Sequence, residues 1–288
     1  MKSIIIVGAG QFGRSVIDLL NRTYYIIMAF ADNNKDLQGT TLKTALGPVP
    51  ILSMQDAISY KPDIMLISVT DEARGLELEH QIRSLGYRGD ILFLRDLYQI
   101  FDIRSATLHR LAERIKSLQI PGSVAELGVY KGDIAWQLNI LFPNRKLILF
   151  DTFEGFDKKD IETEFIQDYS HAKEGDFADT SIDYVRQRMF YPLQVCFRKG
   201  YFPETSIGLE NERYSLVSLD ADLYEPILSG LEYFYPRLNK GGMILLHDYN
   251  NSRFRGAKQA VADYESKHES LFLIPLCDLH GTAVIIRN

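Results

Sequence analysis

The chain has 288 residues, 46% of them hydrophobic, and its 32 basic and 38 acidic side chains leave a net charge of −6. This length and apolar content favour two domains with sizeable cores, while the lack of clustered Lys and Arg argues against a nucleic-acid partner. No apolar run reaches the roughly 20 residues that cross a bilayer, and residues 1–4 lead into a glycine-rich turn instead of a signal peptide. We therefore expect a cytoplasmic protein with no membrane partner.

Short apolar runs alternate along the chain with longer amphipathic stretches, in two separate series. This alternation is typical of parallel sheets covered by helices. The first series predicts helices at 11–22 and 72–86 and strands at 3–10, 25–32, 63–69 and 91–94. The stretch at 105–118 has apolar residues three and four positions apart, which predicts an amphipathic helix. The second series predicts strands at 124–128, 146–151, 193–200, 214–220, 242–248, 271–276 and 281–287.

These patterns divide the chain into a Rossmann-like nucleotide-binding domain at 1–100, a connecting helix within 101–119, and a second domain at 120–288. The last two predicted strands are joined by too short a turn for a parallel crossover, so the final strand must be antiparallel. A parallel sheet that ends in an antiparallel hairpin is the outline of a class I methyltransferase. The predicted fold class is therefore α/β, with two Rossmann-like domains.

The first domain carries the pattern Gly8-x-Gly10-x-x-Gly13 directly after a strand, and Asp32 ends the next strand. In a dinucleotide-type site the glycines let backbone N–H groups approach a phosphate at a helix N-terminus, and the acid accepts a ribose hydroxyl. The four residues are therefore candidate nucleotide contacts. A tight structural corner without a ligand is the alternative interpretation of the same turn.

The first domain also resembles a known class of domains. The stretches GAGQFGRSVIDLL, FADNNKDLQGTTL and GPVPIL are similar to the N-terminal nucleotide-binding domains of bacterial sugar-modifying acyltransferases, over about residues 1–97. The resemblance implies a pocket for a nucleotide-sugar. Nothing in this part of the sequence indicates a centre for proton or hydride transfer.

A second glycine turn, VAELGVYKGD, opens the second domain. Open α/β sheets bind ligands at the carboxyl ends of their strands, where Asp151 is placed to accept the hydroxyls of a ribose. A cofactor with a ribose, a cationic sulfonium and no pyrophosphate suits such a turn, which points to S-adenosylmethionine. The candidate cofactor-binding residues here are Glu126, Gly128, Tyr130, Gly132, Asp151 and Thr152.

The motifs of the second domain, read together, resemble one enzyme family. VAELGVYKGD, LFDTFEGF, GDFADTS, RKGYFPET, SLDADLYEP, FYPRLNKGGMILLHDYN and GAKQAVADY are similar to the macrocin O-methyltransferase type of sugar methyltransferases, often called TylF or MycF-like. The match spans about residues 120–287. It implies S-adenosylmethionine as methyl donor, a divalent metal, usually Mg²⁺, a sugar substrate and some self-association. It also implies that Asp176 and Phe177 border the adenine.

The resemblance assigns the acids at two strand ends to metal binding and catalysis. It implies that Asp220 binds the metal and acts as base, and that the pair His247 and Asp248 supplies the other ligands. The family commonly has two acids at that pair, so His247 leaves the metal open between Mg²⁺ and the softer Mn²⁺. His247 is thus a candidate ligand, a candidate orienting group for a metal-bound water, or itself the base.

Several neighbouring residues allow a structural interpretation. Asp222 suits the N-cap of the helix that follows it, which is the interpretation we favour for it. His171 and His280 fit solvated loops. The long polar segment 153–181 is typical of a functional loop such as a lid.

The sequence thus predicts an S-adenosylmethionine-dependent, metal-assisted O-methyltransferase for a sugar hydroxyl, with a nucleotide as candidate ligand of its first domain. Two alternatives stay open. One is an NAD(P)-dependent oxidoreductase that uses the first glycine turn. The other is a non-catalytic nucleotide-binding protein in which neither turn supports a reaction.

Overall fold

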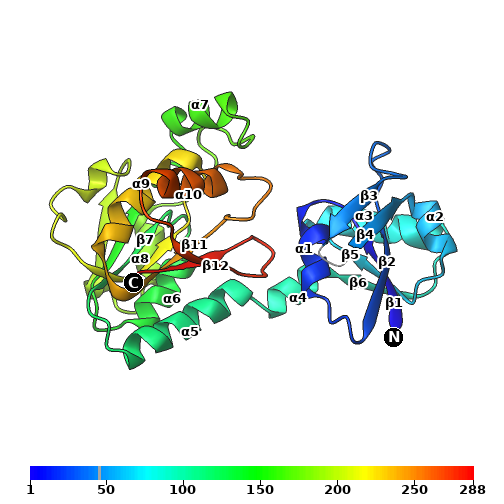
Figure 1. The fold of residues 1–288 in the computed structure, drawn as a ribbon, viewed down its shortest axis with the longest axis horizontal. Helices are drawn as coiled ribbons and strands as arrows, with labels where there is room; N and C mark the ends of the chain where they lie inside the picture. The colour runs from blue at the N-terminus through cyan, green and yellow to red at the C-terminus, as the bar shows by residue number, and fades with distance from the viewer. Residues whose placement is uncertain (45–46) are drawn as a thin grey trace. The chain divides into compact units, whose positions relative to one another are not determined.

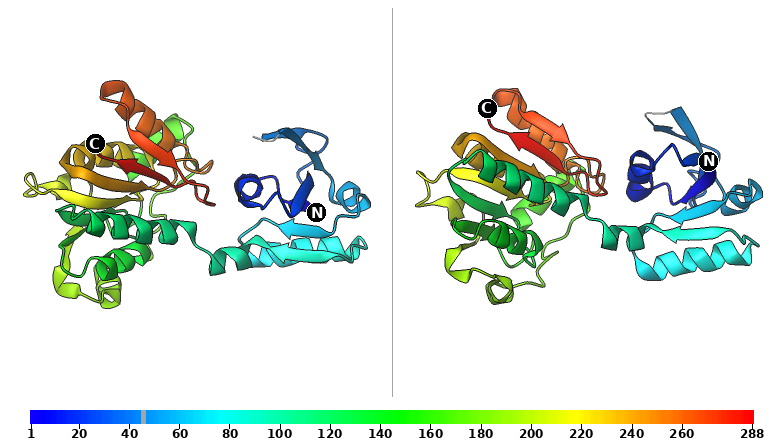
Figure 2. Two further views of the ribbon diagram at one scale, coloured as in Figure 1. Left: turned by 60° about the horizontal axis from the view of Figure 1, so that its bottom comes forward. Right: turned by 90° about the horizontal axis from the view of Figure 1, so that it is seen from below.

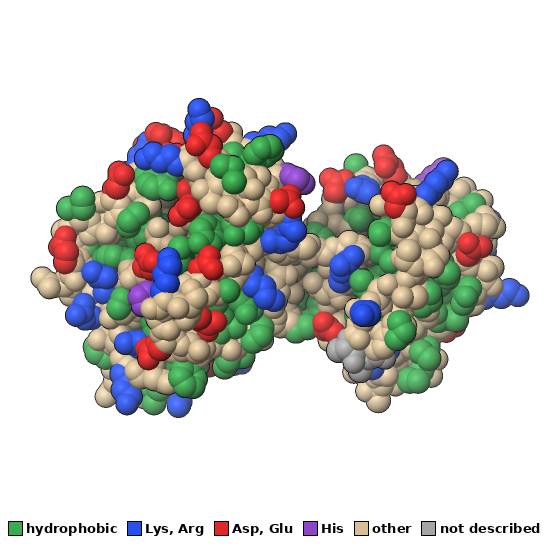
Figure 3. Space-filling model, turned by 45° about the horizontal axis from the view of Figure 1, so that its top comes forward, with side chains coloured by type: hydrophobic (Ala, Val, Ile, Leu, Met, Phe, Trp, Pro, Cys, Tyr) green, Lys and Arg blue, Asp and Glu red, His purple; other side chains and the backbone are tan. Residues whose placement is uncertain are grey.

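The computed structural model describes residues 1–44 and 47–288. The chain forms two compact α/β units, each with its own sheet (Figure 1). Unit 1 comprises Met1–Asp102 together with Cys277–Leu279, and unit 2 comprises Ile103–Leu276 and His280–Asn288. Within the described ranges, no helix combines the length and the apolarity needed to cross a membrane. On the face drawn in Figure 3, acidic and basic side chains are interspersed.

The sheet of unit 1 has the strand order β3-β4-β2-β1-β5-β6, in which only the β3–β4 pair is antiparallel among the pairings described. Its strands are β1 (Lys2–Val7), β2 (Tyr25–Ala31), β3 (Thr41–Thr44), β4 (Gly47–Leu52), β5 (Ile64–Ile67) and β6 (Asp90–Phe93). Its helices are α1 (Gln11–Leu19), α2 (Met54–Ser59), α3 (Glu72–Ser84) and α4 (Leu94–Ile100). Strand β5, which lies between β1 and β6, is buried throughout, as expected of a strand covered on both faces.

The sheet of unit 2 has the order β12-β13-β11-β10-β7-β8-β9. Its strands are β7 (Ser123–Leu127), β8 (Leu147–Asp151), β9 (Val195–Lys199), β10 (Tyr214–Leu219), β11 (Leu238–Leu246), β12 (Phe272–Pro275) and β13 (Ala283–Ile286). Its α-helices are α5 (Ile103–Ser117), α6 (Asp133–Leu141), α7 (Lys158–Ile166), α8 (Ile182–Arg188), α9 (Tyr224–Phe234) and α10 (Gly256–Lys267). Strand β13 is antiparallel to both β11 and β12, which confirms the predicted final hairpin.

Helices cover both faces of this sheet (Figure 2). A hydrophobic cluster fills the space between the sheet and each layer of helices. Neighbouring residues of β7 divide between them: Val124 packs with α5 and α6, whereas Ala125 packs with α9 and α10. Strand side chains alternate between faces, so each layer of helices buries one half of every strand. The strand ends are left uncovered by this packing, and the candidate site lies at the carboxyl ends.

Candidate active site

The glycine turn after β7 forms one wall of the candidate site. Gly128 has a φ of +85°, and a Cβ atom placed there would lie 2.0 Å from the carbonyl oxygen of Asp220. Gly132, with a φ of +78°, is the N-cap of α6. Only glycine meets both the left-handed conformation and the close approach at position 128. The turn is therefore pressed directly against the end of β10.

Asp151, the last residue of β8, fastens this turn to the sheet. One of its carboxylate oxygens accepts hydrogen bonds from the backbone N–H groups of Val129 at 2.6 Å and Tyr130 at 2.9 Å. The other accepts from the N–H of Phe153 at 2.6 Å. A carboxylate offers about four acceptor positions. The backbone thus takes three of them, and the contact with a ribose that the sequence predicts would use what remains.

Glu126 differs from the other candidates because it lies inside the sheet. Its exposed fraction is 1%, and within the described residues its Oε2 has no hydrogen-bond partner. Burial raises the pKa of Glu126 well above its usual range, and the nearby charge of Asp220 raises it further. This side chain is therefore a buried acid next to the site, and a ligand would reach it only through the turn.

The aromatic residues beside the turn lie together. The ring of Phe177 packs edge-on against Tyr130, with centroids 5.1 Å apart, and against Phe156 at 5.2 Å. The other two candidates in this region hold the loop instead. Thr152 donates its hydroxyl to the carbonyl of Gly155 at 2.8 Å, and the carboxylate of Asp176 accepts from the N–H of Lys173 at 3.0 Å.

The charged residues at the ends of β10 and β11 form a tight cluster. These strands are parallel neighbours, with Leu219 paired to Leu246, so the residues that follow them meet at one edge. Nδ1 of His247 lies 2.8 Å from Oδ1 of Asp220 and 2.6 Å from Oδ2 of Asp248. The structure thus brings together the three residues that the sequence proposed as metal ligands.

The ionisation of this cluster follows from its burial and its neighbours. Burial alone would raise the pKa of Asp220, but the positive charges of Arg104 and His247 hold it below its usual range. Burial would lower the pKa of His247, but Asp220 and Asp248 raise it to about 10. At neutral pH the imidazole is therefore protonated and donates to a carboxylate.

Asp222 belongs to the same cluster. The interpretation of this residue as a helix N-cap is wrong, because α9 has Leu223 at its N-cap and no side chain caps it. Asp222 instead offers an oxygen within the group formed with Asp220, His247 and Asp248, whose ligand atoms all lie within 4.8 Å of one another. Burial and the charge of Asp248 raise the pKa of Asp222 well above its usual range.

Two further residues at this edge escaped the sequence reasoning. Arg104, near the start of α5, places Nη2 2.7 Å from Oδ2 of Asp220. His280 is half-buried instead of solvated, and its ring centroid lies 5.3 Å from that of His247. His171 is exposed in a loop, as predicted. Neither Arg104 nor His280 lies in a motif of the second domain, so only the folded chain brings them to the site.

The segment predicted as a lid contains helix α7 and is anchored to the rest of unit 2. Its buried Glu164 accepts a hydrogen bond from the backbone N–H of Tyr224 at 2.8 Å. Asp160, also buried, accepts from the hydroxyl of Tyr201 at 2.6 Å. Such contacts fix α7 beside α9, next to the charged cluster.

Unit 1 has its own turn and cavity. Asp32 accepts hydrogen bonds from the N–H groups of Ala9 at 2.7 Å and Asn34 at 2.8 Å. A Cβ atom at Gly13 would lie 2.0 Å from the carbonyl oxygen of Gly8, whereas one at Gly10 would meet nothing within 4 Å. A cavity of about 560 Å³ opens beside this turn, and its lining includes Gly8, Asp32, Asn33, Asp71, Arg74 and Gln81.

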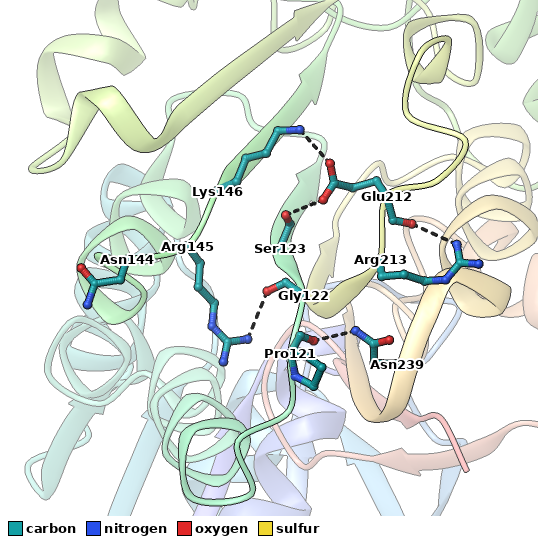
Figure 4. A pocket seen from close by; sticks show the side chains of 9 residues that line it. All are labelled: Pro121, Gly122, Ser123, Asn144, Arg145, Lys146, Glu212, Arg213 and Asn239. Carbon is teal, nitrogen blue, oxygen red and sulfur yellow. Dashed lines mark hydrogen bonds and ion pairs between the residues drawn. The ribbon is translucent and has the colours of Figure 1, made fainter.

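A second cavity, of about 620 Å³, lies at the opposite edge of the unit 2 sheet from the charged cluster (Figure 4). Its polar groups bind one another: Glu212 accepts from Lys146 and Ser123, both at 2.7 Å, and Arg145 donates to the carbonyl of Gly122. We assign these residues to the packing of the strand starts, away from the candidate site.

The strand order of unit 2, the antiparallel β13 and the glycine turn with its strand-end acid define a class I methyltransferase fold. Residues 99–288 match the profile of the macrocin-O-methyltransferase (TylF) family, and the chain belongs to this family. It is an S-adenosylmethionine-dependent O-methyltransferase, which sets aside the oxidoreductase and non-catalytic alternatives. Residues 3–73 match the family of the PglD N-terminal domain.

Individual relatives agree with the family match. The chain is 27% identical over 196 residues to the 8-demethyl-8-(2,3-dimethoxy-alpha-L-rhamnosyl)-tetracenomycin-C 4'-O-methyltransferase of Streptomyces olivaceus, covering 64% of this chain and 73% of that one. It is 31% identical over 166 residues to the mycinamicin III 3''-O-methyltransferase of Micromonospora griseorubida, covering 52% and 62%. The structure of the O-methyltransferase NovP shares the fold, with a TM-score of 0.53, 23% identity and coverage of 64% and 79%.

Proposed function

We propose that unit 2 transfers the methyl group of S-adenosylmethionine to a sugar hydroxyl, with the help of a divalent cation, and that unit 1 binds a nucleotide. The observation that supports this most directly is the meeting of Asp220, His247 and Asp248 beside the turn at Gly128. The name of the Streptomyces olivaceus relative includes a rhamnosyl group methylated at a 4'-oxygen, which supports a sugar acceptor.

In this proposal Asp220 is the base. A neutral sugar hydroxyl is a poor nucleophile, so its proton must leave as the methyl group moves from sulfur to oxygen. Bound S-adenosylmethionine would supply the methyl group and leave as a neutral thioether, while the carboxylate of Asp220 would take the proton of the hydroxyl. Without a cation, His247 is protonated and steadies the charge of Asp220 and Asp248. It would have to lose this proton to act as a metal ligand, and Asp220 would then take the proton of the sugar hydroxyl.

The donor set at the cluster fits a divalent cation. Asp220, Asp222 and Asp248 offer carboxylate oxygens and His247 an imidazole nitrogen, all within 4.8 Å of one another. Oxygen donors suit Mg²⁺, and the added imidazole favours Mn²⁺. When bound, such a cation would polarise the sugar hydroxyl and lower its pKa. Asp220, His247 and Asp248 are the ligands we propose, with Asp222 as a fourth.

For the cofactor we propose the turn and its aromatic neighbours. Gly128 and Gly132 would admit it, Asp151 and Glu126 would face its polar groups, and Tyr130 with Phe177 would lie against the adenine. Thr152 and Asp176 would act by holding the loop between them.

Titration calorimetry with S-adenosylhomocysteine tests the cofactor site, with and without Mg²⁺ or Mn²⁺. We expect micromolar binding by the full chain and its loss in Asp151→Ala, because that variant releases three backbone N–H groups of the site. Asp32→Ala is the matched control, since it removes the equivalent acid of unit 1, and it should bind as tightly as the wild type. Absence of binding in the wild type under every condition would overturn the proposal.

For unit 1 we propose a nucleotide, such as that of a nucleotide-sugar, in the cavity beside Gly8 and Asp32. The match to the PglD N-terminal domain and the cavity of about 560 Å³ support it. The test is calorimetric titration of the full chain with nucleoside diphosphates and nucleotide-sugars. Binding that is lost in Asp32→Ala but kept in Asp151→Ala is expected. Loss in Asp151→Ala alone would place the nucleotide in unit 2 instead.

A further inference from the structure

Arg104 is the residue of the charged cluster that comes from furthest away in the sequence. It is the second residue of α5, and only 14% of its side chain is exposed. Its Nη2 donates to Oδ2 of Asp220 at 2.7 Å, while Nδ1 of His247 lies 2.8 Å from Oδ1. Both oxygens of Asp220 therefore already hold a nitrogen donor from the chain itself.

The contact between Arg104 and Asp220 is a strong but single one. Of the guanidinium nitrogens, Nη2 makes the described bond, and Nε is buried without a partner within residues 1–44 and 47–288. Two parallel bonds would hold the pair more firmly than this arrangement does. An arginine held by one bond at a buried carboxylate can be exchanged for another cation.

We infer that Arg104 is a resident cation that occupies Asp220 until a divalent metal displaces it. This inference rests on the metal site of the proposed function. A guanidinium and a divalent ion that share one carboxylate repel each other strongly in a poorly solvated site. In the meantime Arg104 balances the charge of Asp220, so the acids stay close together before the metal arrives.

An alternative role, in which Arg104 orients Asp220 as a metal ligand, predicts the opposite change in metal affinity when Arg104 is replaced. If Arg104 served to orient Asp220 as a ligand, its removal would loosen the carboxylate and weaken metal binding. If it competes, its removal takes away a positive charge and strengthens metal binding. The affinity for a metal therefore separates the two roles without any measurement of methyl transfer.

The test is Mn²⁺ binding by the full chain, followed by electron paramagnetic resonance of the free ion and by calorimetry. We expect Arg104→Gln to lower the Kd for Mn²⁺ at least tenfold and Arg104→Lys, which keeps the charge on a different head group, to fall between it and the wild type. Arg110→Gln is the control on the same helix, because that side chain is 79% exposed and pairs with Glu113. It should leave the Kd unchanged.

The outcomes are distinct. A Kd in Arg104→Gln that equals or exceeds that of the wild type would overturn the inference and leave the metal site standing. A Kd at least tenfold lower in Arg104→Gln, with binding abolished by Asp220→Asn in the same background, would support it. If neither the wild type nor any variant binds Mn²⁺, both the displacement of Arg104 and the proposed metal site are overturned. Binding of S-adenosylhomocysteine would still support the proposed cofactor site. Should Arg104→Gln not fold, as judged by circular dichroism, the comparison of Arg104→Lys with the wild type decides.

Discussion

In both units an acid holds the glycine turn that follows the first strand of the sheet. The units differ in the residue that follows the strand on the other side of that first strand. In each, an acid that lies at the end of the second strand accepts hydrogen bonds from the glycine turn: Asp32 from Ala9 and Asp151 from Val129 and Tyr130. The residue after the other neighbouring strand is different in the two units. After β5, Ser68 donates to the carbonyl of Val7, whereas after β10, Asp220 enters the charged cluster.

From this difference we propose that the turn and its acid serve ligand binding, while the chemistry depends on the residues that the adjacent strand presents. In unit 1 the hydroxyl of Ser68 is engaged by the backbone of the turn. A buried carboxylate among charged groups gives the edge of unit 2 a place for a proton or a cation.

Asp220→Asn should lower kcat for methyl transfer by about a thousandfold, within the range found when a base or a metal ligand is lost. Binding of S-adenosylhomocysteine should stay near the wild-type value, because the turn and Asp151 are intact. The rate at which S-adenosylhomocysteine forms from S-adenosylmethionine, in the presence of an accepting sugar, measures kcat. Calorimetry measures the binding of S-adenosylhomocysteine. Activity close to the wild type would show that the adjacent strand does not supply the chemistry.

Gly128→Ala should destabilise unit 2 by about 3 kcal/mol, since the new Cβ atom needs a positive φ and would overlap the carbonyl oxygen of Asp220. Urea unfolding, followed by circular dichroism, measures the change. If the variant were as stable as the wild type, the turn would not be pressed against β10 as described.

Asp160→Asn tests helix α7, which follows β8, whereas turns follow the corresponding strand β2 of unit 1. Burial raises the pKa of Asp160 to about 6 from its ordinary value of 3.8, against the opposing hydrogen bond from Tyr201. The protonated acid is thus the form that folding favours. Its contribution is complete below pH 3.8 and is lost as the pH rises through about 6.

The variant should therefore be more stable than the wild type at pH 8, by about 2 kcal/mol, and should lose this advantage near pH 4. Thermal or urea unfolding at the two pH values measures it. Glu162→Gln on the exposed face of the same helix is the control and should show no such dependence. An advantage that is equal at both pH values would mean that the charge of Asp160 is not the cause.

Gly10→Ala should change the stability of unit 1 by less than about 0.5 kcal/mol, because its Cβ atom would meet nothing within 4 Å. It should nonetheless weaken a nucleotide that approaches the backbone there. Urea unfolding measures the change in stability. Calorimetric titration with the nucleotide found for unit 1 measures the change in affinity. Unchanged nucleotide affinity would favour the interpretation of this turn as a structural corner, in which Gly13 alone is needed.

Local patterns in the sequence were enough for the strands other than β3 and β4, for the final hairpin and for both glycine turns. In unit 1 the same patterns missed β3, β4, α2 and α4, because these elements are short and β4 contains Pro48 and Pro50, which are unusual in strands. In the candidate site, the family resemblance grouped the strand-end residues Asp220, His247 and Asp248, and the parallel pairing of β10 with β11 brings them to one edge.

The rest of the site could not be read from local patterns. Arg104 reaches Asp220 from 116 positions away, and His280 meets His247 from a loop after β12. Asp222 could be taken for a cap because an acid before a helix is common, and only the geometry of α9 shows otherwise. Contacts made by the tertiary fold leave no periodic signal in the sequence.

Several side chains at the candidate site lie on backbone that twists in the left-handed sense. Tyr130, Phe153, Phe177, Asp222 and Asp248 all have φ between +47° and +66°, a region where most residues other than glycine are disfavoured. Glycine at these positions would relax the chain and remove the groups that the site uses. Selection of variants for thermal stability alone would therefore favour glycine at these positions. The selected variants would be stable but would be poor methyltransferases.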